Sequence, residues 1–259
     1  MPRLTLVIGN KNYSSWSLRP WLALRQAGIP FDEVLIPLYR PDSAAPLAKW
    51  SPSAKVPALH DGDIRVWDSL AICEYLHERF PHKQLWPADA AARAVARSVS
   101  AEMHAGFGAL REHMSMNIRA RRPGQGRTPE CLADIERIAS VWTDCRARFG
   151  EGGEFLFGRF SIADAMYAPV VLRFQTYGVA LTGAAKDYAD AVLAPEPRYA
   201  FYADLNLLAN YGGPELTPVE PLSLIMTGVR MRSEDPLVAQ TLQRLGTRPL
   251  GLHLDAEVK

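Results

Sequence analysis

Three serines lie close together after a short apolar segment that reads as a buried strand. Ser14, Ser15 and Ser17 follow residues 4–8, and residues 18–25 carry apolar side chains at helical spacing. The three hydroxyls are therefore expected at a helix N-terminus, where unpaired N–H groups and the helix dipole stabilise an anion. One serine there is usually only an N-cap. Three serines in four positions make the stretch a candidate site for a negatively charged ligand atom.

Two further features are expected at the same end of the predicted sheet. Val56-Pro57 precedes a strand, and a proline there could hold a cis bond that turns the backbone toward a neighbouring groove. Asp68-Ser69 follows a strand and opens a helix, so its hydroxyl and backbone N–H groups could bind a carboxylate. An ordinary helix cap is the alternative reading of Asp68-Ser69.

The elements that must position these residues change in kind along the chain. The pattern predicts strands at 4–8 and 31–38, a hairpin of strands at 58–60 and 64–67, and helices that end near Gly28 and Pro81. This is an α/β unit of about eighty residues. After it, the sequence predicts helices at 90–122, 129–149 and 161–178, the last beginning with the capping-box spacing of Ser161 and Asp164. Residues 195–259 contain 7 of the 20 prolines, and only 234–245 look helical there.

Composition excludes several classes of function. The chain has 259 residues, with 29 Lys and Arg against 28 Asp and Glu, so its net charge of +1 predicts no nucleic-acid or membrane partner. No apolar run is long enough to span a membrane. The three cysteines are unpatterned, which favours a reducing, cytoplasmic location over a disulfide framework. The six histidines show no paired ligand spacing, and we expect no metal site.

Taken together, three segments of the chain resemble the cytosolic glutathione S-transferases. They are the serine stretch 14–17 with Arg19, the stretch 55–59 around Val56-Pro57, and 68–76, which begins with Asp68-Ser69. The zeta class, which includes maleylacetoacetate isomerase, is the nearest. The resemblance implies an α/β thioredoxin-like N-terminal domain at 1–82, an all-α C-terminal domain at 83–259 and a homodimer. The tail at 195–259 departs from the family pattern.

The resemblance also implies a role for each candidate residue. Ser14 would donate a hydrogen bond to the sulfur of glutathione, with Ser15 as the reserve candidate. Val56 would pair its backbone with the cysteinyl part of glutathione, with Pro57 in the cis form. The remaining glutathione contacts would come from Asp68 and Ser69 at the γ-glutamyl carboxylate and from Lys55 at either carboxylate. Position alone suggests walls for the electrophile site: Met103, Phe107, Arg111 and Met114.

The implied reaction is attack of the glutathione thiolate on a small electrophile. A free thiol with a pKa near ~8.5 is mostly protonated at neutral pH, so the site must stabilise the thiolate. Two alternatives remain open. One is glutathione-dependent cis-trans isomerisation of a dicarboxylic diketo acid; Trp16, where zeta enzymes have cysteine, speaks against it. The other is a binding protein of the same fold that does not activate the thiol.

Overall fold

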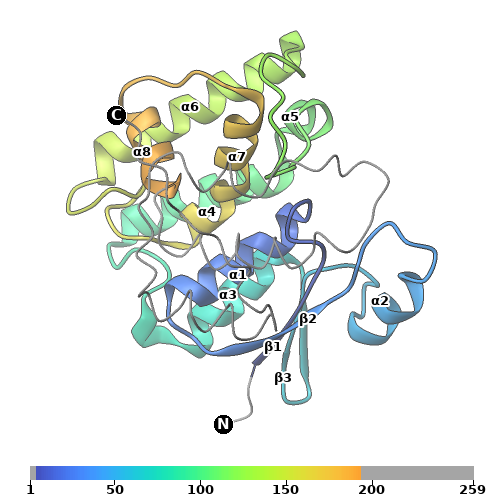
Figure 1. The fold of residues 1–259 in the computed structure, drawn as a ribbon. Helices are drawn as coiled ribbons and strands as arrows, with labels where there is room; N and C mark the ends of the chain where they lie inside the picture. The colour runs from blue at the N-terminus through green and yellow to red at the C-terminus, as the bar shows by residue number, and fades with distance from the viewer. Residues whose placement is uncertain (1–3, 194–259) are drawn as a thin grey trace, which may run out of the picture. The chain divides into compact units, whose positions relative to one another are not determined.

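A four-stranded mixed sheet forms the first layer of the protein, which a computed structural model describes from residue 4 to residue 193 (Figure 1). The strand order is β2-β1-β3-β4, with β1 at Leu4–Ile8, β2 at Phe31–Leu35, β3 at Ala58–Asp61 and β4 at Ile64–Trp67. β1 runs parallel to β2 and antiparallel to β3, and β3 and β4 form the predicted hairpin. The parallel pair needs a crossover, which helix α1 supplies.

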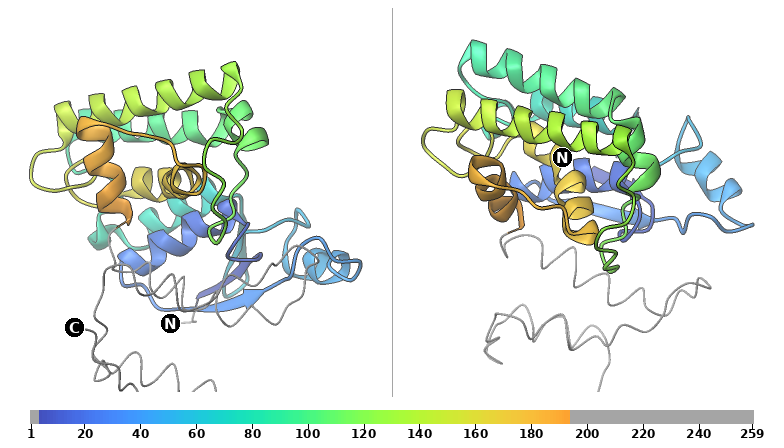
Figure 2. Two further views of the ribbon diagram at one scale, coloured as in Figure 1. Left: turned by 45° about the horizontal axis from the view of Figure 1, so that its top comes forward. Right: turned by 90° about the horizontal axis from the view of Figure 1, so that it is seen from above.

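Two helices separate the sheet from the rest of the described chain. α1 at Ser15–Gln26 and α3 at Ser69–Arg79 pack on each other and lie between the sheet and the later helices in Figures 1 and 2. The short α2, at Ala44–Trp50, lies to one side in both figures. α1 follows β1, and its N-terminus carries the serine stretch; α3 follows β4, and its N-terminus carries Asp68-Ser69.

The second layer is built of helices and the segments that connect them. It contains α4 at Ala90–Ala105, α5 at Gly108–His113, α6 at Pro129–Phe149, α7 at Ile162–Tyr177 and α8 at Gly183–Leu193, and a short 3₁₀ helix at Pro81–Lys83 precedes them. α7 is buried on every side and packs on both α1 and α4. Its capping box is present, as the spacing of Ser161 and Asp164 predicts.

The prediction of one helix at 90–122 is wrong beyond residue 105. The chain leaves the helix at Gly106, which is extended, and Phe107 has a positive φ of 58°. Residues 114–128 are not helical, because part of their backbone bonds to Asn12 and Thr176 instead of to itself. α2 and α8 were not predicted, and the second strand ends at Leu35 instead of residue 38.

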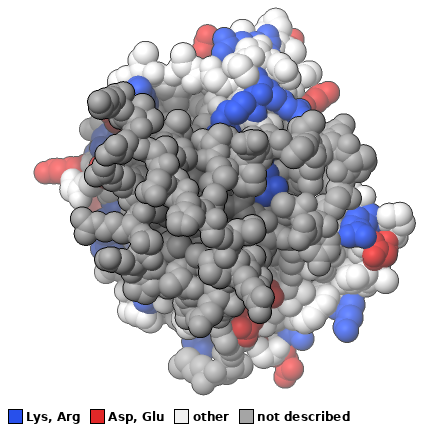
Figure 3. All heavy atoms as spheres, viewed as in Figure 1, with Lys and Arg blue, Asp and Glu red and all other residues white. Residues whose placement is uncertain are grey.

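The predicted fold class is confirmed: a thioredoxin-like layer followed by a helical one. The boundary at residue 82 stays a prediction, and the tail at 195–259, with its predicted helix at 234–245, lies outside the described residues. Over residues 4–193, no helix is long and apolar enough to cross a membrane. On the face in Figure 3, Lys and Arg side chains are interspersed with Asp and Glu over the described atoms in view.

Candidate active site

Ser14 is the N-cap of α1, and its hydroxyl is engaged within the first turn. The Ser14 Oγ accepts from the backbone N–H of Ser17 at 3.4 Å and donates to the Ser17 Oγ at 2.8 Å. The Ser17 Oγ in turn accepts from the N–H of Gly9 at 3.0 Å. Ser14 is 6% exposed, so the hydroxyl lies at the edge of the buried interior. A ligand that accepts from Ser14 must therefore take over the hydrogen now shared with Ser17.

Ser15, the first residue of α1, faces the helical layer. Its Oγ accepts from Nη2 of Arg173 in α7 at 3.3 Å, while Nη1 of Arg173 donates to the carbonyl of Met114 at 2.5 Å. Since the Ser15 oxygen accepts from a cation, its own O–H is polarised and remains available as a donor. The structure thus gives both serines a route to donate to a negatively charged atom.

Three arginines lie near the serine stretch with little compensating negative charge. Burial, followed by the charges of Arg111 and Arg173, lowers the pKa of Arg19 to about 9. Burial and then Arg111 lower the pKa of Arg173 to about 10. Both guanidinium groups stay charged at neutral pH. Nε and Nη1 of Arg19 have no hydrogen-bond partner among residues 4–193, although Arg19 is 2% exposed. A buried cation with unused donors is typical of a site that takes an anion.

Trp16 occupies the space between two of these arginines. The guanidinium carbons of Arg19 and Arg111 lie 4.3 and 4.9 Å from its ring centroid, and the ring of His104 meets it edge-on at 5.2 Å. Cation–π contacts of this kind offset part of the cost of burying the guanidinium groups. Trp16, whose type departs from the zeta pattern, therefore forms part of the arginine cluster.

Asp68 and Ser69 begin α3 as predicted. The Asp68 carboxylate caps the helix by accepting from the N–H groups of Leu70 and Ala71, at 2.9 and 3.3 Å, and its other oxygen lies 3.1 Å from Nε2 of His104. The Ser69 Oγ is buried and has no hydrogen-bond partner in the described part of the chain. Asp68 is therefore a helix cap, which is the alternative reading of this motif. Ser69 presents an unused hydroxyl at the same helix N-terminus, and the binding of a carboxylate there stays a prediction.

Lys55, Val56 and Pro57 form the turn that enters β3. The Val56–Pro57 peptide bond is cis, as the resemblance implies. Lys55 is exposed, Val56 is half-buried and Pro57 is buried.

The four predicted walls of the electrophile site lie around α4 and α5. Met103, Phe107 and Met114 are buried in the main hydrophobic core, so packing alone accounts for these three side chains. Arg111 is half-buried, donates to the carbonyls of Met103 and His104, and stacks on Trp16. Among the four, Arg111 is the one that the structure brings into the arginine cluster.

Sequence reasoning missed Arg173 and His104. The signal for Arg173 was present, because it is the single charged side chain in the apolar run that follows Asp164 in α7. Nothing in the spacing marked His104. Burial raises the pKa of the neighbouring Cys73 to about 12, which makes its thiol unreactive. No group of three or more potential metal ligands occurs within residues 4–193.

Comparison with protein families identifies both layers. The N-terminal domain of glutathione S-transferase matches residues 13–79, and the C-terminal domain of glutathione S-transferase matches residues 93–200. The chain is 26% identical over 168 residues to glutathione S-transferase Z2 of Arabidopsis thaliana, which covers 61% of this chain and 75% of that protein. It is 28% identical over 176 residues to a stringent starvation protein A homolog of Coxiella burnetii, covering 68% of this chain and 78% of that protein.

Solved structures agree on the fold. A maleyl pyruvate isomerase, described as a bacterial glutathione S-transferase of the zeta class, superposes with a TM-score of 0.58 at 22% identity, over 76% of this chain and 94% of that one. The two family matches cover both structural layers in the expected order. This chain belongs to the glutathione S-transferase superfamily and is similar to its zeta class.

Proposed function

We propose that this protein is a glutathione transferase that joins the sulfur of glutathione to a small electrophile. The observation that carries the proposal is the pair of buried hydroxyls at the first turn of α1, Ser14 and Ser15, with Arg173 donating to Ser15. In the proposed reaction the thiol loses its proton to solvent, the thiolate forms a carbon–sulfur bond, and the leaving group departs with the bonding electron pair.

Stabilising the thiolate is the task of the serine stretch. Lowering the thiol pKa by about two units requires ~2.7 kcal/mol of preferential stabilisation of the anion. A charge-assisted hydrogen bond from a hydroxyl supplies about 1.5–3 kcal/mol, and the N-terminus of α1 adds about 0.3–1 kcal/mol. In this proposal Ser14 makes the bond to sulfur. Ser15, whose oxygen already accepts from Arg173, is the second candidate.

The remaining residues fit the rest of the glutathione molecule. The unpartnered hydroxyl of Ser69 lies at the start of α3, where a carboxylate is stabilised by the helix N-terminus. Asp68, beside it, would help Ser69 to hold the γ-glutamyl carboxylate by fixing the helix turn through the N–H groups of Leu70 and Ala71. The backbone of Val56 offers the pairing groups for the cysteinyl part, and Lys55 reaches a carboxylate from the exposed turn.

The arginine cluster favours a second candidate function, the isomerisation of a dicarboxylic diketo acid. Arg111 and Arg173 are close enough to Arg19 to lower its pKa, and Arg111 also lowers the pKa of Arg173. The Nε and Nη1 atoms of Arg19 have no partner over residues 4–193. A substrate with carboxylates would supply the missing acceptors. In that reaction the thiolate adds to the carbon–carbon double bond, the single bond left between the same two carbons rotates, and the thiolate leaves as the double bond re-forms.

A binding protein of this fold without thiol activation is the remaining alternative, and the match to a stringent starvation protein A homolog supports it. We further propose that the protein works in the cytoplasm as a homodimer.

Steady-state kinetics separate these functions. The transferase proposal predicts turnover of a chromogenic aromatic electrophile with glutathione and loss of about a hundredfold in kcat/KM in Ser14→Ala. Turnover of a dicarboxylic cis-enone with none of the aromatic electrophile would select the isomerase. Binding of glutathione without turnover of either substrate would select the binding protein and refute the first two.

A further inference from the structure

The three residues before Tyr13 are Asn10, Lys11 and Asn12, and each forms hydrogen bonds or an ion pair with a different part of the molecule. The Oδ1 of Asn10 accepts from the backbone N–H of Leu38, just beyond β2, at 2.7 Å. The carbonyl of Asn10 accepts from the N–H groups of Tyr13 and Ser14 at 3.1 and 2.8 Å. The backbone of Ser14 is therefore set by the loop at 9–13 and not by α1 alone.

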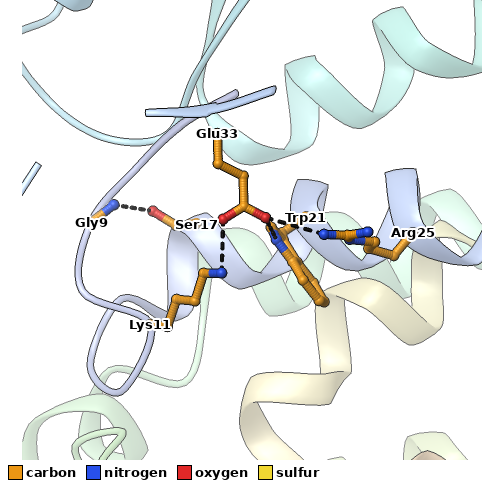
Figure 4. Close-up of polar contacts among 6 residues, drawn as sticks. All are labelled: Gly9, Lys11, Ser17, Trp21, Arg25 and Glu33. Carbon is orange, nitrogen blue, oxygen red and sulfur yellow. Dashed lines mark hydrogen bonds and ion pairs between the residues drawn. The ribbon is translucent and has the colours of Figure 1, made fainter. Parts of the chain in front are cut away.

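Lys11 fastens the same loop to β2 and α1. Its Nζ lies 2.7 Å from Oε2 of Glu33, and the Lys11 side chain is 4% exposed (Figure 4). The other oxygen of Glu33 accepts from Nε1 of Trp21 at 2.6 Å and lies 3.5 Å from Nη2 of Arg25. A buried ion pair is stable only when further hydrogen bonds satisfy its oxygens, and Trp21 and Arg25 do so here.

Asn12 ties the loop to the helical layer. Its Nδ2 donates to Oδ1 of Asn117 at 2.8 Å, and its Oδ1 accepts from the backbone N–H of Arg119 at 3.0 Å. The carbonyl of Asn12 accepts from the N–H of Ile118 at 3.3 Å. Asn12 is 6% exposed, so these bonds form in a largely water-excluded place. Two positions before Ser14, the chain is thus bonded at three points to the segment that was predicted to be helical.

That segment is itself fixed on α7. The hydroxyl of Thr176 donates to the carbonyl of Asn117 at 2.9 Å, and the N–H of Arg122 donates to the carbonyl of Thr176 at 2.7 Å. α7 also carries Arg173, which bonds to Ser15. The serine stretch is therefore held from the helical layer on two sides, through Asn12 and through Ser15.

We propose that Asn12 and Asn117 are positioning residues for thiolate stabilisation, acting through the backbone that leads to Ser14. This inference rests on the proposed transferase function. Hydrogen bonds weaken steeply as their distance and angle depart from the optimum, so a small shift of Ser14 weakens its bond to sulfur more than it weakens the binding of the whole tripeptide. In this proposal the hydrogen bond between the side chains of Asn12 and Asn117 also fixes the position of the sulfur relative to an electrophile bound against the helical layer.

Asn117 offers a conservative variant that makes the test sharp. Its Oδ1 accepts from Asn12 and, at 3.3 Å, from the N–H of Ala120, so Asn117→Asp keeps the acceptor and Asn117→Ala removes it. The control is Arg97→Ala, which removes a different side-chain link between the two layers, the exposed ion pair of α4 with Glu74 of α3 at 3.1 Å. Circular dichroism and denaturant unfolding verify that each variant is folded.

The readouts are the pH profile of kcat/KM for the electrophile at saturating glutathione, which reports the pKa of the bound thiol, and the dissociation constant of S-methyl glutathione, which has no thiolate to stabilise. In Asn12→Ala and Asn117→Ala we expect the apparent thiol pKa to rise by ~0.5–1 unit, with kcat/KM reduced about three- to tenfold below about pH 6, where the thiol is mostly protonated, and restored at high pH. We expect S-methyl glutathione affinity to stay within about twofold. Asn117→Asp and Arg97→Ala should match the wild type.

The experiment distinguishes a failure of the positioning role from a failure of the proposed transferase function. If the wild type lowers the thiol pKa and both alanine variants keep that value, the positioning role is refuted while the transferase function stands. Weakened S-methyl glutathione binding in proportion to kcat/KM would also refute it, because the pair would then be a general structural link. If the wild type itself shows no shift in the thiol pKa, the transferase function fails and the positioning role with it.

Discussion

Replacing Asp164 by alanine removes the acceptor around which the turn before α7 is built. The Oδ1 of Asp164 accepts from the N–H of Leu156 at 3.0 Å, and its Oδ2 accepts from the N–H and the hydroxyl of Ser161 at 2.7 and 2.9 Å. Asp164 is completely buried. In Asp164→Ala two buried backbone N–H groups lose their partners.

The magnitude follows from those two groups. Each unsatisfied buried N–H costs about 1–3 kcal/mol, so the free energy of unfolding should fall by about 2–6 kcal/mol. That is a large share of the ~5–15 kcal/mol that stabilises a typical domain. α7 packs on both α1 and α4, so the loss should reach the whole described unit and not the turn alone.

The pH dependence of stability gives a second readout of Asp164. Burial raises the pKa of its carboxyl to about 6, above the ~3.9 of an unfolded chain. The native state therefore holds the proton more tightly, and the stabilisation from this group is complete below about pH 4. It is lost as the pH rises through about 6. Asp164→Asn, which cannot ionise, should lack this decline.

Urea unfolding followed by circular dichroism measures both effects. The control is Asp144→Ala, which removes an exposed carboxylate paired with Arg148 on α6 and should change stability by less than about 0.5 kcal/mol. A loss below about 1 kcal/mol in Asp164→Ala, or the same pH dependence in Asp164→Asn as in the wild type, would refute the reasoning.

Three further predictions address single residues of the site and the fold. Ser69→Ala should weaken glutathione binding by about tenfold or more, measured by calorimetry, yet leave stability nearly unchanged because the Ser69 hydroxyl has no partner among the described residues. Arg173→Met should raise KM for an anionic electrophile about tenfold more than for a neutral one, because it removes a buried cation beside Ser15. Gly126→Ala should lower stability by more than about 2 kcal/mol, since φ is +71° and a Cβ would lie 2.3 Å from the carbonyl oxygen of His113.

Two of these predictions have a matched control variant, and in Arg173→Met the neutral electrophile is the control. Ser98→Ala removes an exposed hydroxyl on α4 that donates to the carbonyl of Ala94, and should leave glutathione binding unchanged. Gly124→Ala has a φ of +79° but nothing within 4 Å of the added Cβ, so it should cost only about 1–2 kcal/mol. Equal losses in the two glycine variants, or equal KM changes for the two electrophiles in Arg173→Met, would contradict the assigned causes.

The sequence predicted the parts of the fold that local patterns specify. Alternation and β-branching gave the strands and the hairpin, and caps such as Thr128 and Ser161 gave the starts of α6 and α7. The prediction of a helix at 90–122 was wrong at 114–122 because tertiary hydrogen bonds with Asn12 and Thr176 outweigh the helix propensity of these residues. No local sequence pattern reveals such long-range bonds. Gly106 was the one local sign that the helix ends there.

The candidate site was predictable where its residues cap helices. Ser14, Asp68 and Ser69 lie at the starts of α1 and α3, as the strand-to-helix transitions predicted. Arg173 lies 158 residues beyond Ser15, and His104 lies 36 residues beyond Asp68. Only packing of α7 on α1 and of α4 beside α3 brings them to the serine stretch and to Asp68. Their contribution could not be read from spacing.

Ultraviolet difference spectroscopy of the glutathione thiolate, titrated against pH on the wild type, Ser14→Ala and Ser15→Ala, tests the central claim most directly. The account predicts a bound thiol pKa about two units below the ~8.5 of a free thiol, a return toward the free value in Ser14→Ala, and a wild-type-like value in Ser15→Ala. Bound glutathione with an unshifted thiol pKa in the wild type would contradict the transferase mechanism. A shift abolished by Ser15→Ala alone would move the role to Ser15 and its partner Arg173.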